Sequence, residues 1–322
     1  MYKTALSLAL VLGCITSVSA QESLLPTYVN GSGEVTVEGF LRFQAGQGTF
    51  ASPLAEVDFE DDHFLAEFSA AVGVGGGFEI AGSVPFEITG TGEADESGVE
   101  FELETAGLGD LTLEGNFLIA PATKDTPNVM AGLVIVLPTG DDDFGVPEIR
   151  FNGVLVQDGE EGGLGDGVVK AGLQFGVGQQ LAGAYLYALG RIVFSTEKQD
   201  QDDLEIDHPD VFSVVGGAML PLGSNSNLDL RLIAQHVGDE IAEDDLGGES
   251  TEEAHLNMLL DARLYFTVGS AATIVLGANA GWVQDHALDE EAELDLEEVF
   301  TYGVMLGVHL RLGVPVVGGS RK

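Results

Sequence analysis

The sequence has one cysteine, few basic residues and no long apolar run beyond its first 20 residues. Cys14 is the single cysteine among 322 residues, so the chain cannot form an internal disulfide. Lys and Arg number 12 against 53 Asp and Glu, which gives a formal net charge of -41. Nucleic acid is therefore excluded as an expected partner, because phosphate binding needs a basic surface. A membrane-spanning helix is also excluded, since it needs about 18 or more apolar residues in a row.

Residues 1–20 have the pattern of a secretory signal peptide. Lys3 supplies a positive start, residues 5–15 an apolar core, and Val18-Ser19-Ala20 a small-residue cleavage pattern. The mature chain is therefore predicted to begin at Gln21. The alternative is a lipoprotein signal, because Gly13-Cys14 follows the apolar run. If cleavage follows Ala20, no cysteine remains in the mature protein.

From Glu34 to Leu312, apolar and polar residues alternate with a period of two, as in Asp229-Leu230-Arg231-Leu232. Successive side chains of a strand point to opposite faces, so each such segment has one apolar and one charged face. Segments of about ten residues behind a secretion signal predict an all-β fold, a transmembrane antiparallel up-and-down β-barrel. Its predicted location is the bacterial outer membrane, with the lipid bilayer as a partner. A short N-terminal segment (21–33), the barrel (34–313) and a tail (314–322) complete the organisation.

Clusters of Gly, Pro, Asn and Asp place the turns and predict fourteen strands, with twelve as the alternative. The predicted strands are 34–46, 63–75, 77–89, 99–106, 110–119, 128–138, 148–157, 168–178, 182–195, 210–222, 227–238, 255–268, 272–284 and 298–313. Shorter and longer connections alternate along this list. This alternation is typical of short periplasmic turns and longer external loops, with both ends of the barrel on the periplasmic side.

The longer connections concentrate the acidic residues. They are 46–63, 90–98, 120–127, 158–167, 196–209, 239–254 and 285–298, and together they hold 35 Asp and Glu against two Lys. Such loops can simply be a solvated surface. The functional alternative is a cation-attracting rim or a surface for divalent cations such as calcium, because hard cations take clustered carboxylates. None of the runs has the fixed spacing of a known calcium loop.

The phase of the alternation assigns most strand-borne charges to the inner face. The opposite phase would place them in lipid, at about 2–4 kcal/mol for each Arg or Lys near the midplane. Such a wall is either a salt-bridge lattice that braces the barrel or a lining that selects solutes. The expected lumen-lining residues are Glu38, Arg42, Glu67, Glu79, Glu87, Glu114, Arg150, Lys170, Arg191, Asp229, Arg231, Asp261, Arg263, His309 and Arg311.

Catalytic chemistry has little support in the sequence. Six histidines occur, but no inward serine pairs with His309 to suggest a nucleophile and its base. No paired spacing of histidines and carboxylates suggests a zinc site. We therefore expect neither an enzyme, nor a cofactor, nor a metal centre.

Two motifs resemble those of a known family. Gly107-Leu108-Gly109-Asp110-Leu111 and Leu137-Pro138-Thr139-Gly140-Asp141 are similar to the "GLGDL" and "LPTGD" segments of the outer-membrane family named for the meta-pathway of phenol degradation. The resemblance covers residues 64–141 and implies a monomeric barrel that passes hydrophobic or aromatic compounds. Its motif residues here are Gly107, Gly109, Asp110, Pro138, Thr139 and Gly140. By their chemistry, Gly109-Asp110 is expected to form a tight turn and Pro138-Thr139-Gly140 to end a strand.

The sequence thus predicts an outer-membrane channel or transporter for small organic solutes, including aromatic or hydrophobic ones. The alternative is a non-conducting structural or surface-interaction barrel with acidic, calcium-binding external loops. The chain departs from the usual barrel pattern near its end, where many barrels finish on an aromatic residue and this one runs on to Lys322.

Overall fold

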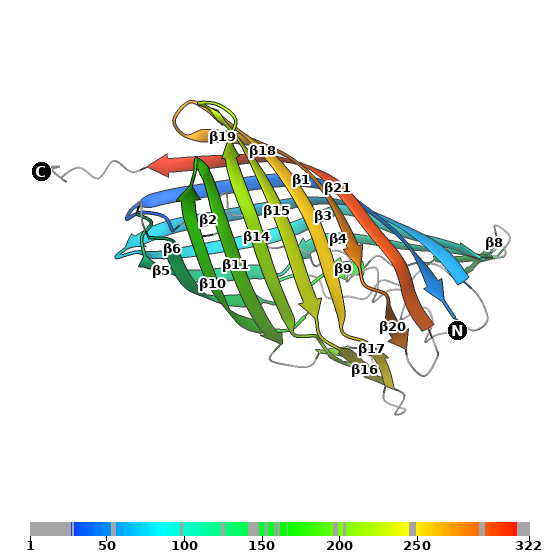
Figure 1. The fold of residues 1–322 in the computed structure, drawn as a ribbon. Helices are drawn as coiled ribbons and strands as arrows, with labels where there is room; N and C mark the ends of the chain where they lie inside the picture. The colour runs from blue at the N-terminus through cyan, green and yellow to red at the C-terminus, as the bar shows by residue number, and fades with distance from the viewer. Residues whose placement is uncertain are drawn as a thin grey trace, which may run out of the picture.

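The computed structural model is a closed barrel of twelve antiparallel strands (Figure 1). It describes Thr27 and residues 29–313, except 53–55, 97–98, 124–125, 141–147, 152–153, 158, 160–161, 166, 196–198, 202–203, 245–248 and 290–293. The predicted signal peptide and the tail 314–322 lie outside the described residues. Within the described part of the chain, no helix is long and apolar enough to cross a membrane.

The ring is built from strands that each pair with the next one around the barrel. In order they are β1 (Glu34–Ala51), β2 (Glu56–Gly75), β3 (Phe78–Glu96), β4 (Val99–Gly109) together with β5 (Leu111–Ala120) as one strand of the ring, β6 (Asn128–Leu137), β10 (Lys170–Leu181), β11 (Ala184–Ser195), β14 (Val211–Pro221), β15 (Ser226–Val237), β18 (His255–Val268), β19 (Ala272–Val283) and β21 (Leu294–Gly313). β21 pairs back with β1, with Glu34 opposite Gly313 and Ala51 opposite Asp295, and this pairing closes the ring.

Further strands lie outside the ring. β7 (Glu148–Phe151), β8 (Val154–Gln157), β9 (Gly162–Leu164) and β20 (His286–Asp289) pair with ring strands or with one another. A separate four-stranded sheet contains β12 (Gln199–Gln201), β13 (Leu204–Asp207), β16 (Glu240–Asp244) and β17 (Glu249–Glu252). Parts of the connections at one end of the barrel therefore form strands of their own.

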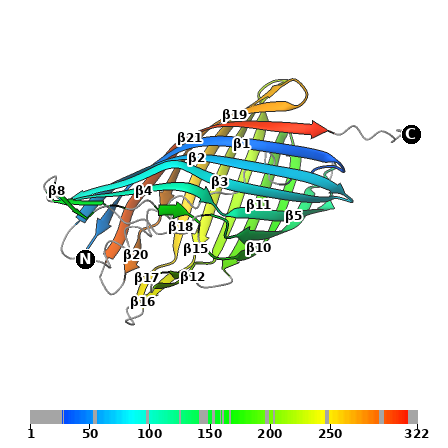
Figure 2. The ribbon, with the colours of Figure 1, turned by 180° about the vertical axis from the view of Figure 1, so that it is seen from behind.

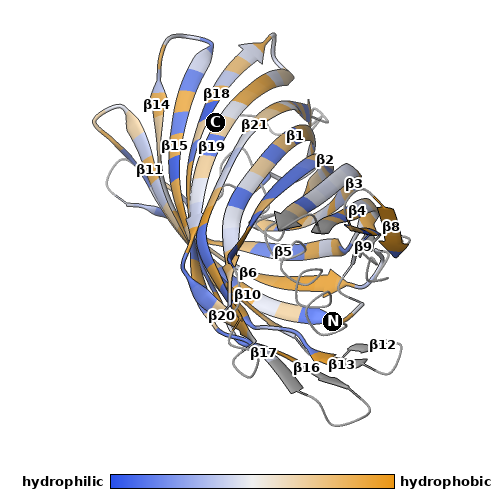
Figure 3. Cartoon of the chain, turned by 90° about the vertical axis from the view of Figure 1, so that its right-hand side faces the viewer, coloured by the Kyte–Doolittle hydropathy of each residue, from blue (hydrophilic) through white to orange (hydrophobic). Residues whose placement is uncertain are grey.

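The outer face of the barrel is apolar, because every second side chain of a strand points outward. In β21, Val304, Leu306 and Val308 are exposed, while Met305 and His309, at alternate positions, are buried. Figure 3 shows the resulting alternation of apolar and polar bands along the strands. Aromatic residues are among the exposed side chains of this face, including Phe78, Phe86, Phe117, Phe194, Phe266, Trp282, Phe300 and Tyr302. Water does not stabilise so large an apolar surface, whereas a bilayer does.

Short turns mark one end of the barrel. The connections 76–77, 182–183, 222–225 and 269–271 lie at the end where β1 begins and β21 finishes. Short turns are periplasmic in outer-membrane barrels, so the opposite end, with the longer connections, is external. The predicted placement of both barrel ends on one side is confirmed. Segment 120–127, which we expected among the external loops, instead joins β5 to β6 at the periplasmic end.

The alternative of twelve strands is confirmed, and the prediction of fourteen is wrong at two places. The expected strands 99–106 and 110–119 together form one strand of the barrel, because β3 pairs antiparallel with both β4 and β5. The expected strand 148–157 is instead the hairpin β7–β8, which pairs with β4 beyond the ring at the external end (Figure 2). Gly and Asp occur both at turns, where the chain reverses, and at short interruptions of a continuing strand. Their presence in the sequence therefore does not distinguish the two cases.

The longest strands extend past the apolar belt and carry a small core of their own. On β2, Asp58, Glu60 and Asp62 are exposed, while Phe59 between them is buried. The buried members of this core are Phe50, Phe59, Ala94, Leu103, Val283, Leu288, Leu296 and Val299. Several acidic segments that we expected to be loops therefore belong to protruding strands, and their carboxylates lie on the outward face of those strands.

Candidate functional site

Four charged side chains of alternating sign form a lattice on the inner wall. Asp229 and Arg231 on β15 stand directly opposite Arg263 and Asp261 on β18. Arg231 Nε donates to Asp229 Oδ2 at 2.6 Å, and Arg263 Nε donates to Asp261 Oδ2 at 2.6 Å. All four side chains are at most 4% exposed. Each charge therefore has opposite charges both along its own strand and across to the next, which offsets the cost of removing it from water.

Two tyrosines join this lattice to an apolar part of the lumen. Tyr187 donates its hydroxyl to Asp229 Oδ1 at 2.8 Å, and Arg231 Nη2 donates to the Tyr265 hydroxyl at 2.8 Å. Tyr265 also packs in a buried cluster with Phe40, Val275 and Met305, which come from β1, β19 and β21. At this level the barrel interior therefore holds charged and apolar side chains next to each other, buried against one another.

A second polar network spans β5, β10 and β11. Gln174 Nε2 on β10 donates to Glu114 Oε2 on β5 at 2.6 Å, and Arg191 on β11 forms an ion pair with Glu114. Arg191 Nη2 also donates to Gln174 Oε1 at 2.9 Å. The strand between β5 and β10 carries Gly132, where an added Cβ would lie 2.3 Å from Asn116 Oδ1. Glycine at this position leaves room for the network.

Polar side-chain contacts also connect β1 with its two neighbours. His309 Nδ1 lies 2.7 Å from Glu38 Oε1, and Arg42 Nη2 lies 3.6 Å from Glu67 Oε2. Nearer the external end, His63 Nε2 lies 2.6 Å from Asp61 Oδ1, and His63 Nδ1 contacts Glu87. The sequence analysis missed Asp61 and His63, although their spacing of two on β2 places them on one face.

Most of the residues expected to line the lumen lie on the inner face. Buried there are Glu38, Glu67, Glu79, Glu87, Glu114, Asp229, Arg231, Asp261, Arg263 and His309, and half-buried are Arg42, Lys170 and Arg191. Arg311 lies at the end of β21, with its side chain 50% exposed, and pairs with Glu34. The expectation for Arg150 is wrong. Its side chain is 46% exposed and pairs with Glu148 on β7, which is not a ring strand.

The N-terminal strap, which comprises Thr27 and residues 29–33, lies inside the barrel at its periplasmic end. Thr27 is fully buried, and its Oγ1 lies 2.6 Å from the Tyr185 hydroxyl on β11. Asn30 donates its backbone N–H to Glu79 Oε2 on β3 at 2.8 Å. An added Cβ at Gly73 on β2 would lie 2.0 Å from the Gly31 carbonyl oxygen. The strap therefore crosses the lumen from β11 to β2 and β3.

The two motif segments of the family resemblance meet in space. Asp110 Oδ1 accepts hydrogen bonds from the backbone N–H groups of Thr139 at 3.1 Å and Gly140 at 3.0 Å. Thr139 Oγ1 in turn accepts from the Leu111 N–H at 2.9 Å. The expected tight turn at Gly109-Asp110 is wrong, because β4 continues into β5 without reversing. The expected strand end at Pro138 is confirmed, since β6 finishes at Leu137.

Replacing Asp110 with alanine should destabilise the barrel by about 2–3 kcal/mol, because two backbone donors lose a charged acceptor. Asp110→Asn, which keeps an acceptor oxygen, should cost less. The measurement is the urea midpoint of unfolding in detergent micelles, followed by tryptophan fluorescence. Glu104→Ala removes an exposed carboxylate from β4 and is the control. An equal midpoint for Asp110→Ala and Glu104→Ala would contradict this role of Asp110.

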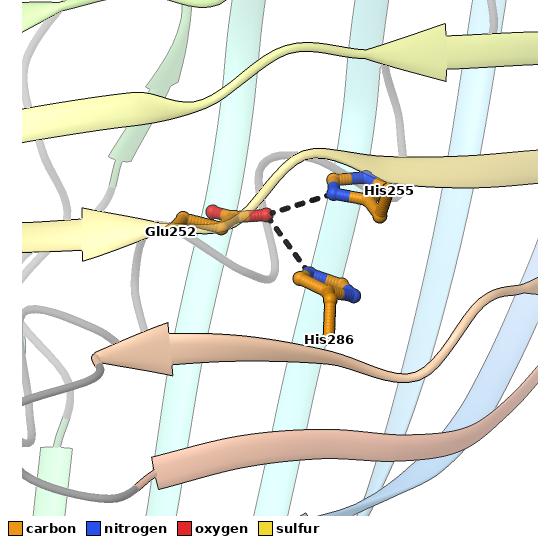
Figure 4. Close-up of side chains that lie close together, drawn as sticks. All are labelled: Glu252, His255 and His286. Carbon is orange, nitrogen blue, oxygen red and sulfur yellow. Dashed lines mark hydrogen bonds and ion pairs between the residues drawn. The ribbon is translucent and has the colours of Figure 1, made fainter.

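A third polar cluster lies at the external end, where β17, β18 and β20 meet (Figure 4). Glu252 Oε1 lies 3.1 Å from His286 Nε2 and 3.6 Å from His255 Nδ1. The two imidazole rings stack, with centroids 4.0 Å apart. Burial would lower the pKa of His286, but its hydrogen bonds with Glu252 and with the Gln284 carbonyl raise that pKa above its usual value. The sequence analysis did not find this cluster, because His286 follows Glu252 by 34 positions.

The fold matches those of outer-membrane proteins. An outer-membrane channel of Pseudomonas putida F1 superposes with a TM-score of 0.61 over 90% of this chain and 100% of that chain, at 13% identity. The translocator domain of the autotransporter NalP of Neisseria meningitidis has a TM-score of 0.51 over 96% and 98% of the two chains, at 14% identity. The transport unit of the autotransporter AIDA-I of Escherichia coli has a TM-score of 0.53 over 95% and 98%, at 8% identity.

No protein-family model matches the sequence, and no curated protein sequence matches it. At these identities, likeness to the solved structures shows the fold alone. Closure of the ring and the apolar outer belt agree with that fold. The chain is thus a transmembrane barrel of the bacterial outer membrane.

Proposed function

We propose that the protein is a passive outer-membrane channel for small organic solutes. The observation that carries this proposal is the composition of the inner wall at one level. There the lattice of Asp229, Arg231, Asp261 and Arg263 borders the apolar cluster around Tyr265. A solute with an apolar body and a polar group would find a partner for each part within this wall. Passage of this kind needs no cofactor and no enzymatic step.

The finer part of the proposal concerns the class of solute. Phe40, Tyr265 and Met305 pack together in the barrel interior, and aromatic and thioether side chains such as these pack well against aromatic rings. The resemblance of the Asp110 and Thr139 segments to the phenol meta-pathway family supports the same class. We therefore propose small aromatic compounds that carry a polar substituent as solutes.

Two measurements test this function. The purified barrel in a planar bilayer should conduct ions, and proteoliposomes should swell faster in a small phenolic solute than in a sugar of similar mass. Phe40→Ala, which removes the apolar surface beside Tyr265, should reduce this difference. A folded barrel that neither conducts nor admits either solute would instead favour the non-conducting structural barrel. The extensive pairing among the lumen charges makes that second function worth testing.

The external end should make the channel cation-selective in dilute salt. Its acidic segments create a negative potential that concentrates cations at the mouth. The effect should fade as the Debye length shrinks from about 30 Å at 0.01 M to about 3 Å at 1 M salt. Reversal potentials across salt gradients measure this preference. An anion preference in dilute salt would show that the lumen arginines set the selectivity.

A further inference from the structure

We propose that Glu252, His255 and His286 form a binding site for one divalent transition-metal ion of the zinc class (Figure 4). Each residue offers one ligand atom, and these atoms all lie within 4.8 Å of one another. All three side chains are buried, at 8%, 4% and 7% exposure in that order. Burial of three ionisable groups is costly unless they pair or coordinate an ion. This site goes beyond the proposed channel function and does not depend on it.

The spacing of the ligand atoms suits a tetrahedral ion. Zinc bonds to nitrogen and oxygen are about 2.0–2.2 Å long, which separates neighbouring ligand atoms by roughly 3.4 Å in a tetrahedron. Glu252 Oε1 lies 3.1 Å from His286 Nε2 and 3.6 Å from His255 Nδ1. Small rotations of the three side chains would therefore bring all of the ligand atoms within bonding distance of one ion.

Backbone groups orient the two histidines. His286 Nδ1 lies 2.8 Å from the Gln284 carbonyl oxygen, and donation of its proton there leaves Nε2 free to bind a metal. A histidine ligand is commonly held in this way by its second ring nitrogen. His255 Nδ1 lies 3.2 Å from the Glu253 carbonyl oxygen, a hydrogen bond that coordination would exchange for a bond to the ion.

The surrounding backbone holds the three ligands at fixed positions. The Glu253 N–H donates to the Ala287 carbonyl at 2.8 Å, and the Gln284 N–H donates to the Leu256 carbonyl at 2.9 Å. These bonds connect the end of β17 to β20, and the segment between β19 and β20 to β18. An ion at this site would fasten the external sheet and β20 to the rim of the barrel.

The ligand set selects the class of ion. Two imidazoles and one carboxylate suit zinc and neighbouring transition metals, whereas calcium and magnesium take oxygen ligands. Three protein ligands leave a fourth tetrahedral position for water. The nearby His208–Glu240 pair, with His208 Nδ1 3.3 Å from Glu240 Oε2, has a single histidine and provides a matched control.

The test is calorimetric titration of the folded, full-length barrel with Zn²⁺ in the presence of excess Mg²⁺, which occupies carboxylate-only sites on the acidic loops. We expect one Zn²⁺ per chain. Each of His286→Asn, His255→Ala and Glu252→Gln should weaken binding by at least about 100-fold, since even loss of an outer partner costs 10–100-fold. His208→Ala should bind Zn²⁺ as the parent does. Heat-modifiable migration on a gel checks that each variant is folded.

Cobalt provides a second readout. Co²⁺ bound by the parent in tetrahedral geometry should show a visible absorption band that His286→Asn abolishes and His208→Ala retains. The proposal is overturned if the parent binds no Zn²⁺ under these conditions. It is also overturned if the three ligand variants bind as tightly as the His208→Ala control.

Discussion

Deleting residues 21–31 should raise the single-channel conductance several-fold while the barrel stays folded. The N-terminal strap crosses the periplasmic end of the lumen and is anchored there by Thr27 and Asn30. Its side chains and backbone occupy cross-section that ions would otherwise use. The deletion keeps Gly33, whose N–H donates to the Gly73 carbonyl at 2.8 Å, and so preserves the start of β1. Planar-bilayer recording of the parent and the deletion variant measures the effect.

A point substitution should produce a smaller form of the same effect. Asn128 Nδ2 on β6 donates to the Thr27 carbonyl, so Asn128→Ala should loosen the strap and give brief openings to the conductance of the deletion variant. Ser32→Ala, at an exposed position of the strap, should leave the recordings unchanged. If the folded deletion variant conducts as the parent does, the strap does not obstruct the channel.

Replacing Arg231 with methionine should destabilise the barrel by about 3–5 kcal/mol, because the substitution leaves two buried carboxylates without a cation between them. Asp229 would lose its partner at 2.6 Å, and Asp261 would lose the cation directly opposite. The Tyr265 hydroxyl would also lose its donor. Urea unfolding in lipid vesicles, followed by tryptophan fluorescence, measures the free energy of unfolding.

Two controls separate this role from a general intolerance of the lumen to substitution. Asp229→Asn combined with Arg231→Met removes both members of the pair and should cost less than the two single substitutions together. Arg311→Met removes a half-exposed arginine from a surface ion pair and should cost at most about 1 kcal/mol. If Arg231→Met and Arg311→Met cost the same, the lattice does not stabilise the barrel.

The period-two alternation was enough to predict the class of fold. It assigned faces correctly in β15, β18 and β21, because a side chain's face depends only on whether its position is odd or even along the strand. The same rule fails where a segment leaves the ring. Arg150 alternates like a wall residue, but β7 pairs beyond the ring with β4. Local sequence does not say which neighbour a strand will find.

The strand count also required the tertiary structure. Gly109-Asp110 has turn composition, yet β3 pairs with both β4 and β5, so the chain does not reverse there. The Asp110 carboxylate instead binds the backbone at Thr139 and Gly140. An aspartate that accepts hydrogen bonds from a distant segment and an aspartate that closes a turn can stand in the same local sequence. The sequence alone therefore does not predict which role Asp110 has.

By itself, the sequence determined that this chain forms a barrel with an apolar outer face, a charged inner face and acidic external segments. These features follow from periodicity and composition, which act within a single strand or loop. Tertiary structure alone decided the twelve-stranded closure, the strap across the lumen and the meeting of Glu252, His255 and His286. Each of these depends on which distant strands become neighbours, and hydrogen bonding around the closed ring settles that choice.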